Sequence, residues 1–397
     1  MNTRRLLLKL AAAALAVVAF DAGLGWFCLR DGEFFRRPVP PYGDVREARW
    51  QHWAAHRREL LQQPQDPAQA LVHDAVLGWT NAKDFRSSEG VRCFNSRGLR
   101  GSREFEARPG PDKLRVALFG ESFIYGEEVD DGDEFAAQLG VMDPGLEVMN
   151  FGVSGFGTDQ ALMRLRSEGV ESHAQVICIG VMLENIVRNV SRFTCLRNPY
   201  VKGLGIKPRF RLVHDALVLV PSPYPTELDV CNAVEAGSLP EAVREYDAFA
   251  EIPYDNWVWK SSLARLYIGW RGSRVRDYRR AWHDESGEPF QLLVAILQAF
   301  DAEARAAGAE RTLVLVFPPK EDLDLVLGGG AKFWTGLARE LALRHIECLD
   351  LTDALALRAR ELAGPAADSS SVFLRAHLNR AGNETVARTL LPRLRAP

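Results

Sequence analysis

Ser122 and His377 are the residues of this chain best suited to nucleophilic chemistry. Ser122 lies in the stretch 114–126, LRVALFGESFIYG, where an apolar run ends at Gly120. Such a run is typical of a buried parallel strand, and ligands bind beyond the carboxyl ends of parallel strands. The pattern therefore predicts a nucleophilic serine in a strand-to-helix turn. The alternative is a serine that only caps the helix.

Three further stretches contain residues that would complete a site for acyl transfer. The first, NFGVSGFGT at 150–158, contains Gly155 in a glycine-rich loop that lets backbone amides turn inward. Asn185 lies in the second, and His377 lies in the third, just before the last expected helix. A histidine can take the proton of an attacking serine, and N–H donors can hold the developing oxyanion.

The elements that must position these residues alternate between strands and helices. Strands are expected at 114–119, 147–151, 175–180, 311–317 and 346–349, and helices at 134–139, 158–168, 332–344, 352–362 and from 379 onward. Thr158 is expected to cap the second of these helices and Gly169 to end it. This alternation predicts an α/β fold, a doubly wound parallel sheet with helices on both faces. Loops that follow its strands can meet at one edge of the sheet.

The N-terminus carries an apolar stretch from Leu6 to Leu29, interrupted by Lys9 and Asp21. Its length fits one membrane crossing of about 20 residues, and Trp26 suits a membrane interface. We expect residues 1–30 to be an uncleaved membrane anchor, with the bulk of the chain on the extracytoplasmic, periplasmic side of an inner membrane. The alternative is a signal segment cleaved after Ala19, which would release a secreted protein.

Composition changes suggest further boundaries along the chain. Residues 31–110 are interpreted as a linker, a juxtamembrane helix and lead-in strands, one of them around Trp79, and 111–397 as the main α/β domain. At about 195–290 the alternation stops, and prolines, aromatic residues and arginines predict a helical or irregular insertion. This insertion could hold an anionic or glycan substrate or dip into a membrane interface, unless it is simply a solvated amphipathic helix.

Several classes of partner and cofactor are not indicated by the sequence. The net charge is −3 among 397 residues, so nothing points to a nucleic acid. The six cysteines form no C-x-x-C pair, although Cys195 and Cys231 could pair in an oxidising compartment. His52 and His56 are spaced i, i+4 without the glutamate of a zinc-protease motif, and no phosphate-binding or calcium-binding motif is present. We therefore expect no metal and no cofactor.

The motifs around these residues resemble the SGNH, or GDSL-like, hydrolase superfamily. Gly120-Glu-Ser122 is similar to the family's nucleophile block, Gly155 to its oxyanion glycine, and His377-Leu-Asn-Arg-Ala-Gly382 to its histidine block. The resemblance covers 114–387 without the insertion. It implies a flavodoxin-like three-layer α/β/α fold and a serine-dependent esterase or acyltransferase. Some membrane-anchored bacterial members handle acetyl groups of exported polysaccharides, which would make an exported glycan the substrate and the cell-envelope polysaccharide machinery a partner.

The chain also departs from the family pattern at two points. Where the family has Asn followed by Asp, this chain has Glu184 followed by Asn185, and a carboxylate aimed at an oxyanion would repel it. We expect Asn185 to supply the donor. The acid that normally precedes the histidine is missing, so the sequence predicts a Ser122–His377 dyad.

Several groups could orient the histidine in place of that acid. They are a backbone carbonyl, Asp368 and Asp353. The competing hypothesis is a catalytically inactive binding or scaffold protein of an envelope polysaccharide pathway.

Overall fold

The structure is a computed structural model that describes residues 3–30, 33–35, 37–39, 43–62, 70–197, 205–250 and 256–395. The chain divides into two compact units. The first comprises Met1–Gln63, Phe193–Leu204 and Leu228–Asp277, and the second comprises Pro64–Arg192, Gly205–Glu227 and Tyr278–Pro397. The second unit contains the predicted sheet, and the first contains the N-terminal helix.

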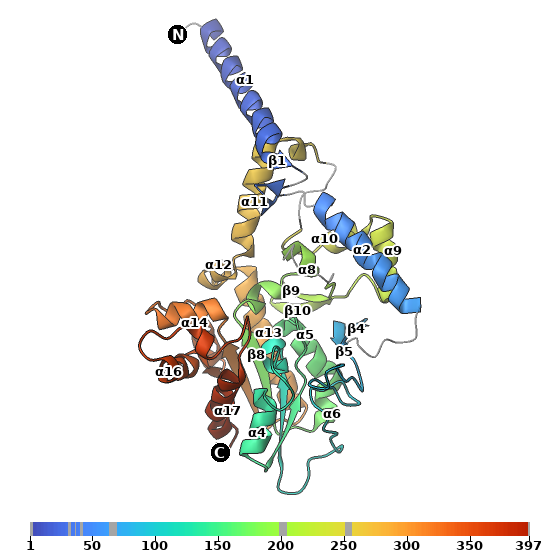
Figure 1. The fold of residues 1–397 in the computed structure, drawn as a ribbon, viewed down its shortest axis with the longest axis vertical. Coiled ribbons are helices and arrows are strands. Elements are labelled where there is room, and N and C mark those ends of the chain that lie inside the picture. The colour runs from blue at the N-terminus through green and yellow to red at the C-terminus, as the bar shows by residue number, and fades with distance from the viewer. Residues whose placement is uncertain are drawn as a thin grey trace. The chain divides into compact units, whose positions relative to one another are not determined.

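A parallel sheet that includes β8 forms the centre of the second unit (Figure 1). It has five strands in the order β12-β11-β8-β6-β7. The strands are β6 (Leu114–Phe119), β7 (Leu146–Asn150), β8 (Val176–Met182), β11 (Arg311–Phe317) and β12 (Glu347–Asp350). Numbered along the chain, this is the order 2-1-3-4-5 of a flavodoxin-like doubly wound sheet. The predicted fold class is therefore confirmed.

Helices cover both faces of this sheet. They are α3 (Ser122–Tyr125), α4 (Phe135–Met142), α5 (Thr158–Arg164), α6 (Val170–Ser172), α7 (Asn185–Arg188), α12 (Tyr278–His283), α13 (Glu288–Ala306), α14 (Lys320–Leu327), α15 (Thr335–Leu343), α16 (Thr352–Ala363) and α17 (Arg380–Arg395). On one face, α4, α16 and α17 share an apolar core with Val116 and Leu118 of β6. On the other, Phe119 stacks on Phe151 at a centroid distance of 4.4 Å and meets Phe300 of α13 edge-on. Alternate residues of β6 thus contribute to two separate cores, one on each face of the sheet. Helices, sheet and helices therefore form three layers.

The helix expected at 158–168 differs from the prediction at both ends. Thr158 is its first residue rather than its cap, since the N-cap is Gly157. Gly169 does not end it, because the chain continues through the π-helical turn η1 (Leu165–Gly169) and α6 to His173, whose φ is +47°. The side chain of Leu165 packs closely against Gly169, since a Cβ there would approach Leu165 Cδ1 to 2.4 Å.

Two small antiparallel pairs complete the second unit. The pair β4 (Leu71–Asp74) and β5 (Gly78–Asn81) confirms the lead-in strand expected around Trp79. The pair β9 (Arg209–Val213) and β10 (Ala216–Val220) lies within the insertion, which is therefore not only helical.

The first unit consists of short elements and two long helices. They are α1 (Thr3–Cys28), β1 (Leu29–Arg30), β2 (Glu33–Phe34), β3 (Arg37–Pro38), α2 (Gly43–Gln62), α8 (Thr194–Arg197), α9 (Glu227–Glu235), α10 (Leu239–Arg244), the 3-10 helix η2 (Trp257–Lys260) and α11 (Ser262–Arg276). Helix α1 has 26 residues and a mean hydropathy of 1.9, with no residue buried, so it is long and apolar enough to cross a membrane. Cys231 is buried in α9, and the side chain of Cys195 lies outside the described residues.

Candidate active site

Ser122 is the first residue of α3, just beyond the carboxyl end of strand β6, which lies between β8 and β7, and its side chain is almost wholly buried. The strand must turn sharply into the helix. Gly120 permits this, because a Cβ there would lie 2.5 Å from Ile124 Cγ1 and 3.3 Å from the backbone of Gly180. Glu121 caps the helix by accepting the N–H of Phe123 at 2.6 Å. The hydroxyl group of Ser122 is thus fixed where a doubly wound sheet presents its ligands.

The structure brings Ser122 and His377 together. The Nε2 atom of His377 lies 2.8 Å from Ser122 Oγ, within hydrogen-bond distance. The loop that carries the histidine is closed by an isolated bridge between Phe373 and Leu378, and the imidazole packs on the ring of Phe123 at 5.3 Å. A base next to a buried serine hydroxyl is the arrangement needed to activate it as a nucleophile.

Glu128, which was not predicted from the sequence, lies on the side of the imidazole away from Ser122. Its Oε1 is 3.6 Å from His377 Nδ1, just beyond a normal hydrogen bond. Its Oε2 accepts the backbone N–H groups of Arg375, Ala376 and His377 at 2.9, 3.2 and 3.3 Å. One carboxylate therefore holds the histidine loop and faces the ring nitrogen opposite Ser122, as an orienting acid would.

The two acids that the sequence suggested for this role are occupied elsewhere. Asp368 caps the 3-10 turn η3 (Ser369–Ser371) by accepting the backbone N–H of Ser370. Asp353 is exposed and forms an ion pair with Lys332 at 2.9 Å. Neither is the carboxylate that the structure places at His377 Nδ1.

The environment of the two groups sets their charges at neutral pH. Burial lowers the pKa of His377 below its usual 6.5, against the opposing charges of Glu127 and Glu128. For Glu128, burial acts to raise the pKa, but the three backbone N–H groups outweigh it and the pKa is lowered. A neutral imidazole beside an ionised carboxylate carries its proton on Nδ1, which leaves Nε2 free to accept the proton of Ser122.

The loop that contains Gly155 is held in place by side chains of the lead-in region. Gly155 has φ +81°, a left-handed conformation that favours glycine. Trp79 donates its indole N–H to the carbonyl of Ser154 at 2.9 Å, and Asn81 donates to the carbonyl of Gly152 at 3.0 Å. The pair β4 and β5 therefore positions the predicted oxyanion loop.

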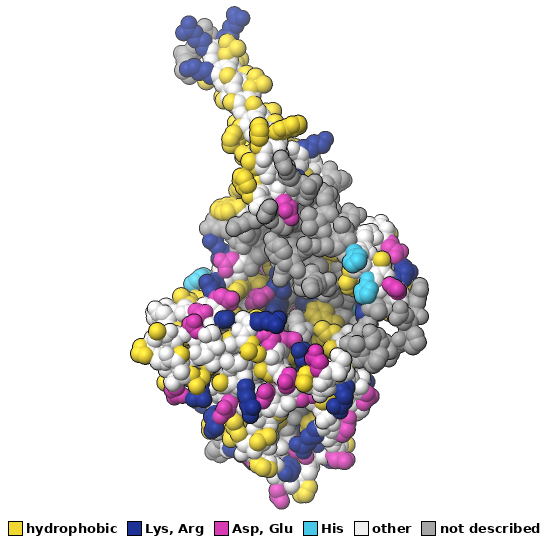
Figure 2. Space-filling view, viewed as in Figure 1, with side chains coloured by type: hydrophobic (Ala, Val, Ile, Leu, Met, Phe, Trp, Pro, Cys, Tyr) yellow, Lys and Arg dark blue, Asp and Glu magenta, His cyan; other side chains and the backbone are white. Residues whose placement is uncertain are grey.

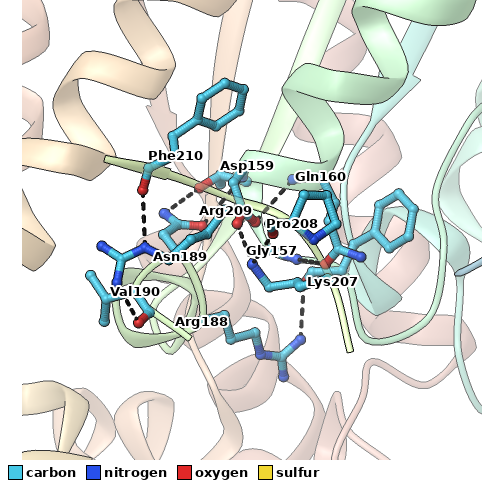
Figure 3. Close-up of polar contacts among 12 residues, drawn as sticks. Gly157, Asp159, Gln160, Arg188, Asn189, Val190, Lys207, Pro208, Arg209 and Phe210 are labelled. Atoms are coloured by element: carbon cyan, nitrogen blue, oxygen red, sulfur yellow. Dashed lines mark hydrogen bonds and ion pairs between the residues drawn. The ribbon is translucent and has the colours of Figure 1, made fainter. Parts of the chain in front are cut away.

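A buried polar network also contacts this loop, around Gly157 (Figure 3). Lys207, from the segment before β9, forms an ion pair with Asp159 of α5, and both side chains are almost fully buried. Asn189 donates to the hydroxyl of Thr158 at 2.6 Å, and Arg188 donates to the carbonyl of Phe156 at 3.1 Å. The loop is thus fixed by contacts from α5, α7 and the insertion.

Asn185 and Glu184 have different environments after β8. The side chain of Asn185 is fully buried, and within the described residues neither its Oδ1 nor its Nδ2 has a hydrogen-bond partner. Because buried amides are normally satisfied, an unpaired one is a candidate for contact with a ligand. Glu184 pairs with Arg188, with Oε2 3.5 Å from its Nη2. Its carboxylate therefore has a cationic partner of its own.

Glu121, next to the nucleophile, is a buried acid whose carboxylate is only partly hydrogen-bonded. Its Oε1 has no hydrogen-bond partner among the described residues, and burial raises its pKa to about 7. Among the same residues there is no group of three or more His, Cys, Asp or Glu side chains that could hold a metal ion.

Comparisons with known proteins find similarity only at the level of solved structures. No protein-family model and no curated protein matches the sequence. An acetylxylan esterase, Axe2, from Geobacillus stearothermophilus is 12% identical, with a TM-score of 0.36 over 72% of this chain and 95% of the other. A member of the lipolytic G-D-S-L family from Veillonella parvula is 12% identical, with a TM-score of 0.33 over 70% and 96%.

Proposed function

We propose that this protein is a serine-dependent esterase or O-acyltransferase that works through an acyl-enzyme. The observation that carries the proposal is the row of three side chains in which His377 lies 2.8 Å from Ser122 Oγ and 3.6 Å from Glu128. Such a row supplies a nucleophile, a general base and a carboxylate that stabilises the imidazolium.

In the first half of the reaction, His377 Nε2 takes the hydroxyl proton as Ser122 Oγ attacks the ester carbonyl. The carbonyl oxygen becomes an oxyanion, for which the backbone N–H groups of Ser122 and Gly155 and the amide of Asn185 are the proposed donors. Collapse of this intermediate breaks the ester bond. The leaving oxygen then receives the proton from His377.

In the second half, a water or a sugar hydroxyl gives its proton to His377 and attacks the acyl-enzyme. Ser122 leaves as an alkoxide and regains the proton from the imidazolium. Water gives hydrolysis and a sugar hydroxyl gives transfer. The site chemistry is the same for both outcomes.

Features outside the site support the proposed substrate class and the proposed location of the protein. An N-terminal helix apolar enough to cross a membrane, together with an insertion rich in aromatic residues and arginines, supports an exported glycan as the ester carrier. We place the catalytic unit on the extracytoplasmic side, where an exported glycan would be found.

The experiment is turnover of a short-chain acetyl ester by the purified full chain and by the variants S122A and H377A. Loss of turnover in both variants, with unchanged folding, supports the proposal. A well-folded parent protein without turnover on acetyl esters or acetylated oligosaccharides would overturn it and favour the binding or scaffold protein.

A further inference from the structure

The C-terminal part of α1 is packed against the start of α11 in the first unit (Figure 1). The carboxylate of Asp21 accepts the backbone N–H of Leu263 at 2.6 Å and the hydroxyl of Ser261 at 3.1 Å. One turn later, Gly25 allows close approach, since a Cβ there would lie 2.7 Å from Ser262 Oγ. The apolar helix is thus joined to the folded unit by specific contacts.

These contacts give an acidic side chain inside an apolar helix a structural role. The first N–H groups of a helix have no partner within that helix. In α11, Ser261 satisfies the N–H of Ala264, and Asp21 satisfies that of Leu263 from a different segment. A carboxylate at a helix N-terminus is also favoured by the helix dipole. A transient signal sequence has no need of such a contact.

Large exposed aromatic side chains lie on both sides of this junction. Trp26 and Phe27 at the end of α1 are 81% and 78% exposed, Trp257 of η2 is 76% exposed, and Tyr267 of α11 is 59% exposed. In soluble proteins such residues are mostly covered, whereas tryptophan and tyrosine are enriched where a membrane meets water. Figure 2 shows hydrophobic side chains along the whole of α1 and basic ones at its N-terminal tip.

The length of the apolar stretch fixes the level of the junction relative to a bilayer. About 20 helical residues span the hydrocarbon core of about 30 Å. Counted from Leu6, that span ends close to Gly25. The contact of Gly25 with Ser262 therefore falls at the boundary of the hydrocarbon core, and the contacts of Asp21 fall about one helical turn inside it. Trp26 and Phe27 follow in the interfacial layer.

We propose that α1 stays attached in the mature protein and that η2 and the first half of α11 lie in the interfacial layer of the lipid bilayer that α1 crosses. Trp257 and Tyr267 then continue the aromatic belt begun by Trp26 and Phe27. The occupant of this exposed aromatic surface is lipid rather than another protein. This inference does not depend on the esterase activity.

The test uses the full chain extracted from membranes and reconstituted into bilayers that contain lipids brominated near the headgroup. First, its intact mass should correspond to a chain that keeps residues 1–19, and a chain that begins at Phe20 would overturn the proposal. Second, brominated lipids should quench its tryptophan fluorescence, and W26F and W257F should each lose a comparable share of the quenched signal.

The control variant is W334F, because Trp334 is buried in the second unit and should leave the quenched share unchanged. The variant D21L keeps an apolar helix but removes the contacts with α11. It should stay in the membrane fraction and lose the part of the quenched signal that comes from Trp257. The variant D21N keeps a hydrogen-bond acceptor and should keep most of that part. Quenching that is the same in W257F as in the parent protein would show that η2 does not contact lipid.

Discussion

Glu128 Oε1 lies 3.6 Å from His377 Nδ1, while the other oxygen of the same carboxylate accepts the backbone N–H of His377. The acid thus contacts both the ring and the loop that carries it. Glu128 comes six residues after the nucleophile in the sequence. The acid of the family pattern comes instead just before the histidine. We therefore propose a Ser122–His377–Glu128 triad in place of the predicted dyad.

We expect E128Q to lower kcat/KM of ester hydrolysis by about 10²–10⁴-fold, with little change in thermal stability. The amide oxygen can still accept the three backbone N–H groups, but it has no charge to stabilise the imidazolium. The matched controls are D368N and D353N, which should keep parent activity because their carboxylates bind Ser370 and Lys332. An active E128Q together with an inactive D368N would reverse the assignment.

The pH profile of the parent protein should show the lowered pKa of His377. Protonated imidazole cannot accept the proton of Ser122, so kcat/KM should fall only as the pH drops below the usual histidine range and should be constant near neutrality. The charge of Glu128 acts to raise this pKa. In E128Q the midpoint should therefore move to lower pH. A midpoint that moves upward, measured on an activated acetyl ester, would contradict this charge assignment.

Asn185 should act on the transition state rather than on binding of the substrate. Replacing it with alanine is expected to lower kcat by about 10²–10³-fold with a much smaller change in KM, as for loss of one oxyanion donor. N185D should be at least as poor, because a carboxylate repels the oxyanion. Steady-state kinetics separate the two parameters, and a rise in KM alone would assign Asn185 to substrate binding instead.

Glu121 should make the protein less stable as the pH rises. Burial raises its pKa from the ordinary glutamate value of 4.5 to about 7 in the folded chain. Between these values the folded state binds more protons than the unfolded state, so this group lowers stability through that window as pH increases. E121Q should therefore be more stable than the parent at pH 8, by on the order of 3 kcal/mol, and similar near pH 4. Thermal unfolding at both pH values checks this, and equal shifts at both would contradict it.

The buried pair of Lys207 and Asp159 should be needed for stability of the loop that contains Gly155. K207M leaves a buried carboxylate without its partner and is expected to cost about 3–5 kcal/mol. The control R388M removes an ion pair with Glu384 whose arginine is 68% exposed, and it should cost less than about 1 kcal/mol. Adding D159N to K207M should recover part of the loss in melting temperature. No recovery would mean that packing of the lysine, rather than its charge, is what matters.

Local patterns in the sequence were sufficient to predict the sheet and the positions of Ser122 and His377. The apolar runs of β6, β8 and β11 identify buried strands, and the ends of parallel strands meet at one edge. Glu128 could not be selected in this way, because it lies among Glu127, Asp130 and Asp131 and nothing local distinguishes it. Only the fold brings it to a loop 247 residues away.

The boundaries of helices were less predictable where a residue serves packing rather than termination. Gly169 was expected to end a helix, but it lies inside one, with right-handed backbone angles and the side chain of Leu165 packed against it. In the same way, Trp79 and Asn81 were predicted only as part of lead-in strands. Their contacts with the oxyanion loop depend on long-range packing, which the hydrophobic periodicity of the sequence does not predict.

The most direct test of the proposed activity is labelling of the full chain with a fluorophosphonate, followed by mass spectrometry of its peptides. The account predicts a single adduct on Ser122, absent in S122A and strongly reduced in H377A and E128Q. An adduct on another serine, or no adduct on a folded chain that retains the Ser122–His377 contact, would contradict the central claim.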